Sequence, residues 1–423
     1  MPSQPGLPPK LTLKPDRRTA AIDIGDEVEP GRSLLVMTEL PGGFSAYVAN
    51  MGIKDDTDDL VVISADAAVP TAAVFTTSRF AGPSVTLSRE HVTNRSARAV
   101  VVISKNANVA TGPDGIADAS EVATTVAAML DCDPTDVVLT STGVIGRRYP
   151  MERVRTGLRA IPQPLPRSDA DRPARGMMTT DTVVKLAEAT LPGGARIVGM
   201  AKGVGMIEPN MATHISLLFT DAAVASDELD ATFRRVVDRT FNCVSIDTDT
   251  STSDSSIVMA SGVAGPVDAA QFEAALYDVA VDLTKQIARD GEGANSLIEV
   301  HVDEAINPAQ AKRVAKAIVN SPLVKTAVHG GDPNWGRVAM AIGKCSDDAD
   351  DQFIDQTGVT IRFGTDEVYP RLLDDAALAA LSGYMSGTEV LIHASLGLGK
   401  SESTVWGCDL SDAYVRFNAD YTT

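Results

Sequence analysis

Short runs of apolar residues, separated by polar stretches, are the feature that most limits how this chain can fold. Nine of these runs have the length and the Val, Ile and Leu content that are typical of β-strands. Many are apolar on both faces or nearly so, and such strands need cover on both sides of their sheet. We therefore expect covered sheets, built from residues 60–66, 99–107, 136–144, 195–203, 256–262, 297–305, 359–364, 389–397 and 414–421.

Other segments have the spacing of amphipathic helices. In residues 226–242, Ser226 is placed to cap the helix, and two acidic residues follow it in the first turn. Residues 268–291 show the same apolar periodicity and end at a glycine, and residues 308–320 and 374–385 predict two more helices. Strands and helices alternate along the chain, so we expect a mixed α/β protein with helices packed on a multi-stranded sheet core.

Size and charge narrow the class of protein. A chain of 423 residues is long enough for roughly two or three domains, or for one large layered domain. Hydrophobic residues make up 44% of it and aromatic residues only 4%, so its core must be built from Val, Ala, Ile and Leu. The net charge of −19, with Lys and Arg scattered, argues against nucleic acid as a partner, because its phosphates would be repelled.

The cysteines and the N-terminus give no sign of metal binding or export. The four cysteines are far apart and form no C-x-x-C pair, so neither a zinc site nor a disulfide framework is expected. Residues 1–40 are rich in Pro and charge, lack the apolar stretch of a secretory signal, and are expected to form a loosely ordered extension. No run of about 18 apolar residues is present. We expect a cytoplasmic protein that contacts no membrane.

The stretch EPNMATHISLLFTDA, residues 208–222, places Thr213 where a Pro-Asn turn meets a buried strand. Thr is common in strands, so the residue can simply begin one. It also permits a specific chemistry, because a Thr hydroxyl becomes a useful nucleophile when a base lies beside it. If the bond between Ala212 and Thr213 is cut, Thr213 gains an α-amine with a pKa of about 7.7–8.0, and one residue supplies nucleophile and base.

The segment AKGVGMIEPNMAT, residues 201–213, resembles the cleavage segment of the ornithine acetyltransferase (glutamate N-acetyltransferase) family, whose members cut themselves before a Thr and use it as nucleophile. Further segments are similar to family motifs in the family's order, from about residue 41 to the end. They are PGGFSAYVANMGIK (41–54), NANVATG (106–112), TSTGVIGRRYP (140–150), MTTDT (178–182), SIDTDTSTSDS (245–255), DGEGA (290–294), DPNWGR (332–337) and NADYTT (418–423).

The resemblance implies a fold, a cleavage site and an assembly. The implied fold is a layered, αββα-like sandwich of mixed β-sheets covered by helices, of the type found in ornithine acetyltransferases and related aminopeptidases. Cleavage between Ala212 and Thr213 leaves an N-terminal fragment, residues 41–212 after the extension, and a C-terminal fragment, residues 213–423. The two fragments are expected to form one intertwined catalytic unit, and two copies of each to assemble into an α2β2 heterotetramer.

Roles of individual residues also follow from the resemblance. Thr142 and Gly143 are implied to form the oxyanion hole, whose donors are typically worth about 2.7–4 kcal/mol each; without the resemblance, the same STG segment is only a turn that ends a strand. An acetylated amino acid presents a carboxylate, which suits Lys202, and ornithine adds an ammonium, which suits Glu292. The implied substrate contacts are Thr179 or Thr180, Lys202, Thr213, Glu292, Asn418 and Thr423.

These residues predict a two-step acyl transfer. The α-amine of Thr213 activates its own hydroxyl, which attacks the acetyl carbonyl of N-acetylornithine or a related N-acetylamino acid and keeps the acetyl group as an ester. Glutamate then takes the acetyl group, which makes the kinetics ping-pong. The scheme requires no metal or other cofactor, and acetyl-CoA as an alternative donor stays open.

Two features near Thr213 have simpler explanations than catalysis. His214 follows the nucleophile, but successive strand side chains point to opposite faces, so a packing role is expected. DTDTSTSD, residues 247–254, is similar to a calcium loop but lacks the Gly and the Glu of its sixth and twelfth positions. A polar turn beside the site is expected there instead.

The sequence leaves two rival functions open. A related self-cleaving aminopeptidase, generally with a Ser nucleophile, would hydrolyse its substrate, and an uncleaved homologue would only bind. Several motifs depart from the common family pattern, such as THIS after the cut, KGVG in place of KGSG, and HGG before DPNWGR. These departures resemble members of the family in specialised-metabolite pathways, such as clavulanic acid clusters, and leave other acyl donors and acceptors open.

Overall fold

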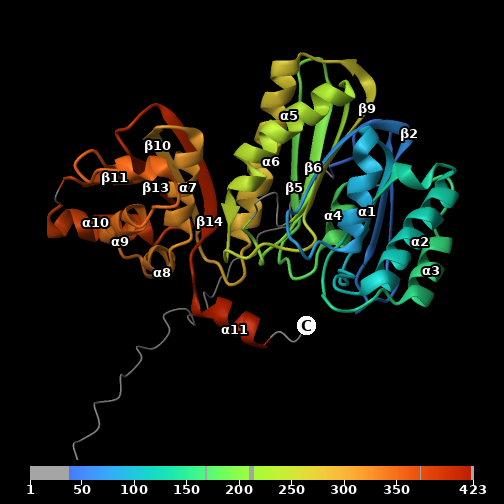
Figure 1. Cartoon of the computed structure of the whole chain (residues 1–423), viewed down its shortest axis with the longest axis horizontal. Coiled ribbons are helices and arrows are strands. Elements are labelled where there is room, and N and C mark those ends of the chain that lie inside the picture. The colour runs from blue at the N-terminus through green and yellow to red at the C-terminus, as the bar shows by residue number, and fades with distance from the viewer. Residues whose placement is uncertain (1–37, 167–168, 209–213, 372, 421–423) are drawn as a thin grey trace, which may run out of the picture. The chain divides into compact units, whose positions relative to one another are not determined.

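The computed structural model describes residues 38–166, 169–208, 214–371 and 373–420, all of which belong to one compact unit, Met37–Thr423. These residues form an eight-stranded sheet, a six-stranded sheet and eleven α-helices (Figure 1). The fold includes the last residues of the predicted extension, because Leu40 is only 4% exposed and Glu39 pairs with Asp169.

The eight-stranded sheet takes strands from both sides of the Ala212–Thr213 bond. Its strand order is β4-β3-β2-β9-β7-β6-β5, with β1 beside β2. The antiparallel neighbours β6 and β7 lie on opposite sides of that bond in sequence, as do β2 and β9. The strands are β1 (Phe44–Ala49), β2 (Leu60–Phe75), β3 (Ser96–Ile103), β4 (Val137–Ser141), β5 (Lys185–Thr190), β6 (Arg196–Lys202), β7 (Ile215–Ala223) and β9 (Ser255–Pro266).

The long strand β2 allows this sheet to fold over on itself. The first part of β2 pairs with β1 and β3, the register shifts between Ser64 and Val69, and the last part pairs with β9. The two halves of the sheet then share one hydrophobic core. Within it, the rings of Phe44 on β1 and Phe219 on β7 meet with their centroids 5.0 Å apart.

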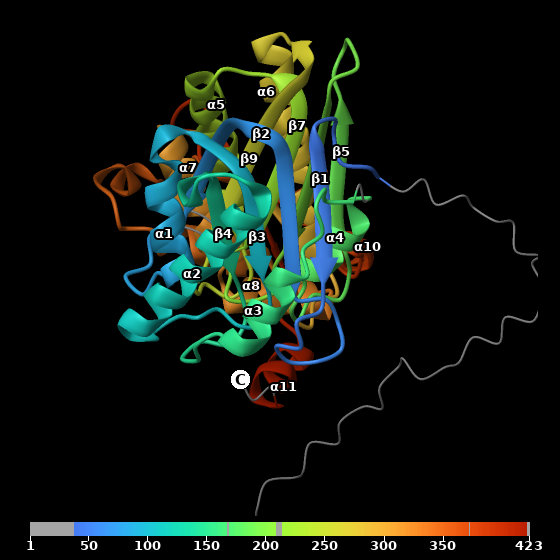
Figure 2. The same ribbon diagram turned by 90° about the vertical axis from the view of Figure 1, so that its right-hand side faces the viewer.

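Helices cover the outer face of each half. α2 (Gly112–Leu130) and α3 (Met151–Arg159) pack on β2, β3 and β4, and Figure 2 looks onto these helices with the strands behind them. α5 (Ser226–Arg239) and α6 (Ala269–Arg289) pack on the other half. The remaining helices near this sheet are α1 (Pro83–His91) and α4 (Asp171–Met177). This layering of helix, sheet, sheet and helix confirms the predicted αββα-like fold.

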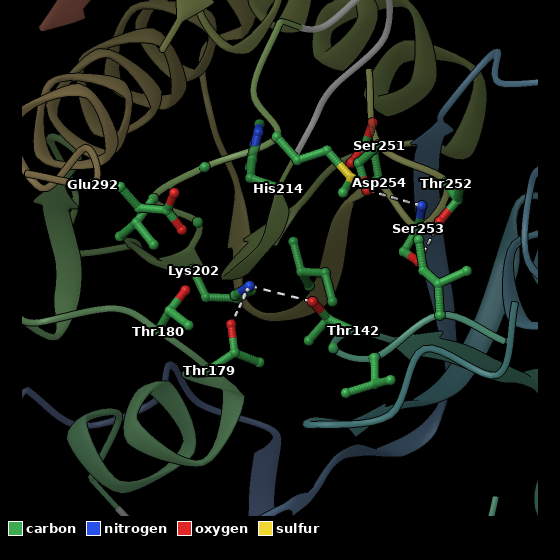
Figure 3. A pocket seen from close by; sticks show the side chains of 18 of the residues that line it. Thr142, Thr179, Thr180, Lys202, His214, Ser251, Thr252, Ser253, Asp254 and Glu292 are labelled. Atoms are coloured by element: carbon green, nitrogen blue, oxygen red, sulfur yellow. Dashed lines mark hydrogen bonds between the residues drawn. The ribbon is translucent and has the colours of Figure 1, made fainter. Parts of the chain in front are cut away.

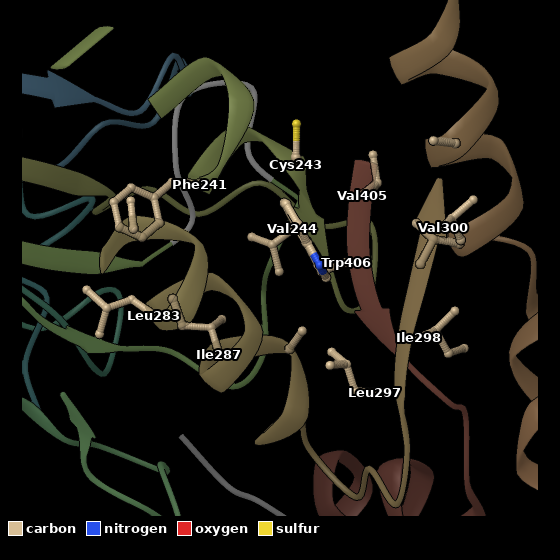
Figure 4. Close-up of a cluster of buried hydrophobic side chains, with 14 of the residues drawn as sticks. Phe241, Cys243, Val244, Leu283, Ile287, Leu297, Ile298, Val300, Val405 and Trp406 are labelled. Atoms are coloured by element: carbon tan, nitrogen blue, oxygen red, sulfur yellow. The ribbon is translucent and has the colours of Figure 1, made fainter. Parts of the chain in front are cut away.

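The six-stranded sheet has the order β12-β11-β13-β10-β14-β8. A hydrophobic cluster joins it to α6, where Leu283 and Ile287 lie beside Val244, Leu297 and Trp406 (Figure 4). Its strands are β8 (Val244–Ser245), β10 (Leu297–Ala305), β11 (Thr360–Phe363), β12 (Asp366–Tyr369), β13 (Glu389–Ser395) and β14 (Ser401–Cys408). The helices that follow β10 in the chain are α7 (Pro308–Val319), α8 (Pro322–Gly330), α9 (Trp335–Gly343), α10 (Asp375–Met385) and, after β14, α11 (Asp412–Asp420).

Eight of the nine predicted strands are strands in the structure, and all four predicted helices are present. The ninth strand prediction, residues 414–421, is wrong, because residues 414–420 lie in helix α11 and residue 421 lies outside the described residues. The hydroxyl of Ser411 accepts the N–H of Tyr414 and supports the start of this helix. The predicted cap of α5 is also displaced: Ala225, in extended conformation, precedes the helix, and Ser226 is its first residue.

The sequence predicts neither a disulfide framework nor a membrane-spanning segment. The cysteines are all described, and each is free: Cys132, Cys243, Cys345 and Cys408. None of the helices in the described ranges combines the length and the apolar character that a membrane crossing needs.

Candidate active site

One pocket of about 210 Å³ collects the ends of strands that are far apart in sequence (Figure 3). Its walls come from the loops after β4 and α4, the end of β6, the start of β7, the turn before β9, the segment after α6, and helix α11. Seven residues predicted from the resemblance line it: Thr142, Gly143, Thr179, Thr180, Lys202, Glu292 and Asn418. The fold therefore brings them together around one cavity large enough for a small amino acid.

The remaining predicted site residues, Ala212, Thr213 and Thr423, lie outside the described residues. His214, which follows Thr213 in the chain, lines the pocket together with Ile215 at the start of β7. The cleavage and the nucleophilic role of Thr213 therefore stay predictions.

Lys202, the last residue of β6, is a buried cation of this pocket. Its side chain is 10% exposed. The Nζ atom donates hydrogen bonds to the hydroxyls of Thr142, at 3.2 Å, and Thr179, at 2.8 Å. Burial lowers the pKa of Lys202, and the carboxylate of Asp181, 3.9 Å from Nζ, opposes that shift. The two hydroxyls and the carboxylate thus fix the ammonium group against the loops that follow β4 and α4.

A buried ion network lies behind Lys202. Nζ of Lys185 is 2.8 Å from Oδ1 of Asp181 and 2.6 Å from Oδ2 of Asp290, and none of these three side chains is more than 5% exposed. Asp181 also accepts the N–H of Gly203 at 2.6 Å. Burial raises the pKa of Asp181, but the charges of Lys202 and Lys185 outweigh it, and the net shift is downward. Asp181 is therefore ionised, and it ties the end of β6 to the MTTDT segment.

Asp181 and Asp290 have no role in the predictions from sequence. Both residues lie in segments that resemble family motifs, MTTDT and DGEGA. Their positions were the available signal, because Asp181 follows Thr180 and Asp290 lies two residues before Glu292, and both neighbours are predicted substrate contacts. Their common partner, Lys185, is the first residue of β5 and lies in none of the segments that resemble family motifs.

The loop after β4 decides which atoms of Thr142 and Gly143 are free to donate hydrogen bonds. The N–H of Thr142 is already bonded to the carbonyl of Ile103 at 3.0 Å, so Thr142 offers its hydroxyl. The N–H of Gly143 has no partner among the described residues. Gly143 has φ +126, and a Cβ here would lie 2.2 Å from the carbonyl carbon of Lys105, so only glycine fits.

Glu292 and Asn418 form the other side of the pocket. Glu292 follows α6, and its Oε2 accepts a hydrogen bond of 2.8 Å from the side-chain amide of Asn418 on α11. Burial raises the pKa of Glu292, and the bond from Asn418 opposes the shift. Gly205 permits the close approach of this carboxylate, because a Cβ there would lie 2.6 Å from the carboxyl carbon.

His214 makes the packing contact that the sequence predicts, but it does not point away from the site, because it also lines the pocket. Its ring lies against Phe241 with centroids 4.5 Å apart, and the residue is 3% exposed. Burial lowers the pKa of His214 to about 3, which makes its imidazole a weak base at neutral pH. The packing role is therefore consistent with both its contacts and its protonation.

The turn before β9 also lines the pocket, as expected for the polar segment 247–254. It contributes Asp254, for which the sequence predicted no individual role. Asp254 is 2% exposed, and burial raises its pKa well above the ordinary value of a carboxyl group. Its Oδ2 atom has no hydrogen-bond partner among the described residues. A Ser- and Thr-rich turn gives no sequence signal for a buried carboxyl group with a raised pKa.

Comparison with known proteins gives the family. The model of the ArgJ family matches residues 45–423. The chain belongs to the ArgJ family. It is 54% identical over 389 residues to the arginine biosynthesis bifunctional protein ArgJ 2 of Nostoc sp., covering 92% of this chain and all of that protein. It is also 54% identical over 389 residues to the glutamate N-acetyltransferase Oat2 of Streptomyces clavuligerus, covering 90% of this chain and 98% of that protein.

Solved structures of ArgJ family members are similar to part of the chain. One is a crystal structure of the arginine biosynthesis bifunctional protein ArgJ from Bacillus halodurans, which is 38% identical in sequence to this chain with a TM-score of 0.44. The match covers 48% of this chain and 98% of the Bacillus chain. The sequence comparisons confirm the family that the motifs predicted. The identity to the Streptomyces clavuligerus protein also fits the resemblance to specialised-metabolite members, although the Nostoc relative is equally similar.

Proposed function

We propose that this ArgJ family enzyme transfers an acetyl group from N-acetylornithine, or a related N-acetylamino acid, to glutamate. The acetyl group passes through an ester of Thr213, formed after the chain cuts itself between Ala212 and Thr213. The observation that carries the proposal is the convergence of seven predicted residues, from five separate segments, on a single pocket. The names of the relatives, which include a glutamate N-acetyltransferase, support this class of reaction.

In the first half of the proposed reaction, Thr213 is acetylated. Its α-amine takes the hydroxyl proton while the hydroxyl oxygen bonds to the acetyl carbon. Negative charge develops on the carbonyl oxygen, and the Thr142 hydroxyl and the Gly143 N–H stabilise it. As the carbon–nitrogen bond breaks, the proton passes from the α-amine to the leaving amine of ornithine, and the acetyl ester remains.

In the second half, the amine of glutamate attacks the ester, and the same donors stabilise the second oxyanion. The proton of the attacking amine returns through the α-amine to the Thr213 hydroxyl, which restores the enzyme. Both substrates carry an α-carboxylate, which we assign to Lys202. Ornithine also carries an ammonium, which we assign to Glu292. The raised pKa of Glu292 makes its protonation easier when the side-chain carboxylate of glutamate arrives instead.

The proposed scheme uses only groups of the chain and the two substrates. Nucleophile, base and oxyanion donors are all supplied by residues, so no cofactor is assigned to it. A donor screen that includes acetyl-CoA tests whether a thioester can replace N-acetylornithine. The cytoplasmic location also stays a prediction, which cell fractionation tests.

We further propose that the two fragments stay together after cleavage and that two copies of each form a heterotetramer. Support for the first part comes from the sheet, because β6 and β7 would belong to different fragments and yet pair along their length. The second part rests on the family resemblance. Light scattering should give twice the 44.4 kDa mass of the chain, with both fragments in one peak.

Intact mass and transfer kinetics test the proposed function. The wild type should give fragments of 212 residues and of 423 − 212 = 211 residues, whereas Thr213→Ala should give one uncut chain without transfer activity. Thr213→Ser is the matched control, because it keeps a hydroxyl nucleophile and should still be cut. Parallel double-reciprocal plots and acetyl transfer to glutamate are expected. Cleavage of the Thr213→Ala chain, or acetyl transfer to water in preference to glutamate, would contradict the proposal.

A further inference from the structure

Two of the five histidines of the chain lie side by side on the six-stranded sheet. His301 on β10 and His393 on β13 are direct partners in the parallel register, and their ring centroids are 5.0 Å apart. Val300 and Val302, the neighbours of His301 in the strand, are fully buried, so His301 faces the other, half-exposed side of the sheet. Asp303, two residues further along β10, shares that side.

The three side chains converge at distances that suit ligands of one ion. Nε2 of His393 is 3.0 Å from Oδ2 of Asp303. One ligand atom from each of the three residues lies within 4.8 Å of the other two. Ligands bound to one Zn²⁺ ion at about 2.0–2.2 Å lie roughly 3.0–3.5 Å from each other. Small side-chain rotations therefore complete the set without moving the strands.

Neighbouring groups orient the rings and add a further oxygen. Nδ1 of His301 is 3.0 Å from the hydroxyl of Thr404 on β14, which leaves Nε2 as the ring nitrogen open to an ion. This Nε2 atom is 3.8 Å from a carboxylate oxygen of Glu402. Oδ1 of Asp303 is buried and has no hydrogen-bond partner among the described residues, and an ion would satisfy it.

We propose that His301, Asp303 and His393 bind one divalent transition-metal ion, with Glu402 as a further ligand. Two imidazoles and a carboxylate suit Zn²⁺, Co²⁺ or Ni²⁺, whereas Mg²⁺ and Ca²⁺ prefer oxygen ligands alone. Glu402 also borders a cavity of about 760 Å³, which gives the ion a route from solvent.

The site is separate from the proposed acetyl transfer. Its residues do not line the pocket that contains Lys202, so the ion has no part in the reaction. Its ligands come from three neighbouring strands, β10, β13 and β14. The ion therefore stabilises the six-stranded sheet by crosslinking these strands.

A simple His–Asp pair is the alternative to a metal site, and the same chain contains one for comparison. Nδ1 of His329 is 2.8 Å from Oδ2 of Asp409, a distance similar to that between His393 and Asp303. In the described part of the chain, only the His301 cluster groups three side chains of this kind. His329 is therefore a matched control that has a carboxylate partner but no second imidazole.

Metal titration of the untagged, full-length protein tests the proposal. After treatment with a chelator and its removal, Co²⁺ binding is followed by visible absorption and Zn²⁺ binding by calorimetry. One ion per chain is expected, with Zn²⁺ displacing Co²⁺ and raising the Tm. His301→Asn and His393→Asn should weaken binding more than about 100-fold, and Thr404→Val about 10-fold. His329→Asn should bind as tightly as the wild type.

Absence of saturable 1:1 binding in the wild type would overturn the proposal, as would equal binding by the wild type and His301→Asn. Either result would leave Asp303 and His393 as an ordinary hydrogen-bonded pair. Acetyl-transfer activity checks that each variant is folded, because these residues lie outside the proposed active site. If a histidine variant does not fold, Thr404→Val keeps every proposed ligand and still gives a measurable loss.

Discussion

The two sides of the pocket differ in how firmly the fold holds them. On one side, Lys202 and the network behind it lie at the ends of central strands, with side chains no more than 10% exposed. On the other side, Glu292 follows a helix, and Asn418 belongs to α11, none of whose described residues is buried. The residues proposed to bind the α-carboxylate and the oxyanion thus lie at the end of a strand, Lys202, or directly after one, Thr142 and Gly143. The residues proposed to recognise the substrate side chain depend on a segment outside the core. Substitutions should therefore cost rate or stability on the first side and mainly binding on the second.

The largest effect is expected at the loop after β4. Thr142→Val keeps the shape of the side chain but removes the hydroxyl that we assign to the oxyanion. The kcat should fall about 10²- to 10³-fold, measured as acetyl transfer at saturating substrate. Thr125→Val is the control. The Thr125 hydroxyl donates a hydrogen bond to a carbonyl of its own helix, so kcat should be unchanged in this variant. A Thr142→Val enzyme within twofold of wild type would remove the distinction between the two sides.

The next effect concerns stability and the buried ion network. Lys185→Met leaves Asp181 and Asp290 without their common partner, so the free energy of unfolding should fall by about 3–5 kcal/mol. Urea unfolding of the uncut Thr213→Ala chain measures this loss. Lys285→Met is the matched control, because Lys285 pairs with Glu299 at 2.8 Å in a partly exposed position, and its loss should be about 0–1 kcal/mol. Equal losses in the two variants would show that burial does not set the strength of the network.

A smaller effect, confined to binding, is expected on the second side. Glu292→Gln removes the charge proposed for the ornithine ammonium, and charge-assisted hydrogen bonds are worth about 1.5–3 kcal/mol. The KM for N-acetylornithine should rise about 10- to 100-fold with little change in kcat. N-acetylglutamate, which has no ammonium, serves as the comparison donor and should be affected far less. The same loss for both donors would contradict the assignment.

The pH dependence of kcat/KM for acylation should report the ionisation of two groups, the α-amine of Thr213 and the ammonium of Lys202. With N-acetylglutamate as donor, kcat/KM should rise with pH as the α-amine of Thr213 loses its proton, around a pKa of about 7.7–8.0. At alkaline pH, kcat/KM should fall again as Lys202 loses its proton. This fall should begin at a lower pH than for an ordinary lysine, because burial lowers the pKa of Lys202. Lys202→Arg should move the alkaline limb to higher pH. An unmoved alkaline limb would mean that another group controls it.

The smallest effect is expected on α11. Val415 is 62% exposed, so Val415→Ser should change the free energy of unfolding by no more than about 0.5 kcal/mol. Val300→Ser, at a fully buried position of β10, is the control and should lower stability by several times as much. A loss above about 1 kcal/mol at Val415 would show that α11 is covered in the assembled enzyme.

Most of the fold could be predicted because its central strands are nearly continuous apolar runs. Residues 60–63 and 99–103 are apolar on both faces, and they belong to the parts of β2 and β3 that are buried between two layers. The segment 414–421 misled the prediction because Val415 and Phe417 alternate with polar residues, as in a half-buried strand. Its described residues, 414–420, pair with no strand, and the helix that forms instead turns Asn418 toward Glu292.

The composition of the pocket could be predicted from motifs, but its internal contacts could not. The motifs identified Thr142, Thr179 and Lys202 separately, and the structure joins them by two hydrogen bonds. The role of Lys185 and the raised pKa of Asp254 had no signal in sequence. Both depend on burial by segments that are distant in the chain, and burial is what shifts a pKa and strengthens an ion pair.

The sequence by itself determined the family, the order of the motifs and the positions of most strands, because apolar runs and motif residues are local properties of the chain. The tertiary structure decided how the two halves of the large sheet face each other, which atoms of Thr142 and Gly143 are free, and which side chains surround Lys202. It also placed His301 beside His393 on neighbouring strands. These features arise from pairing between distant segments, and the register and burial of such pairs are fixed only when the whole core packs.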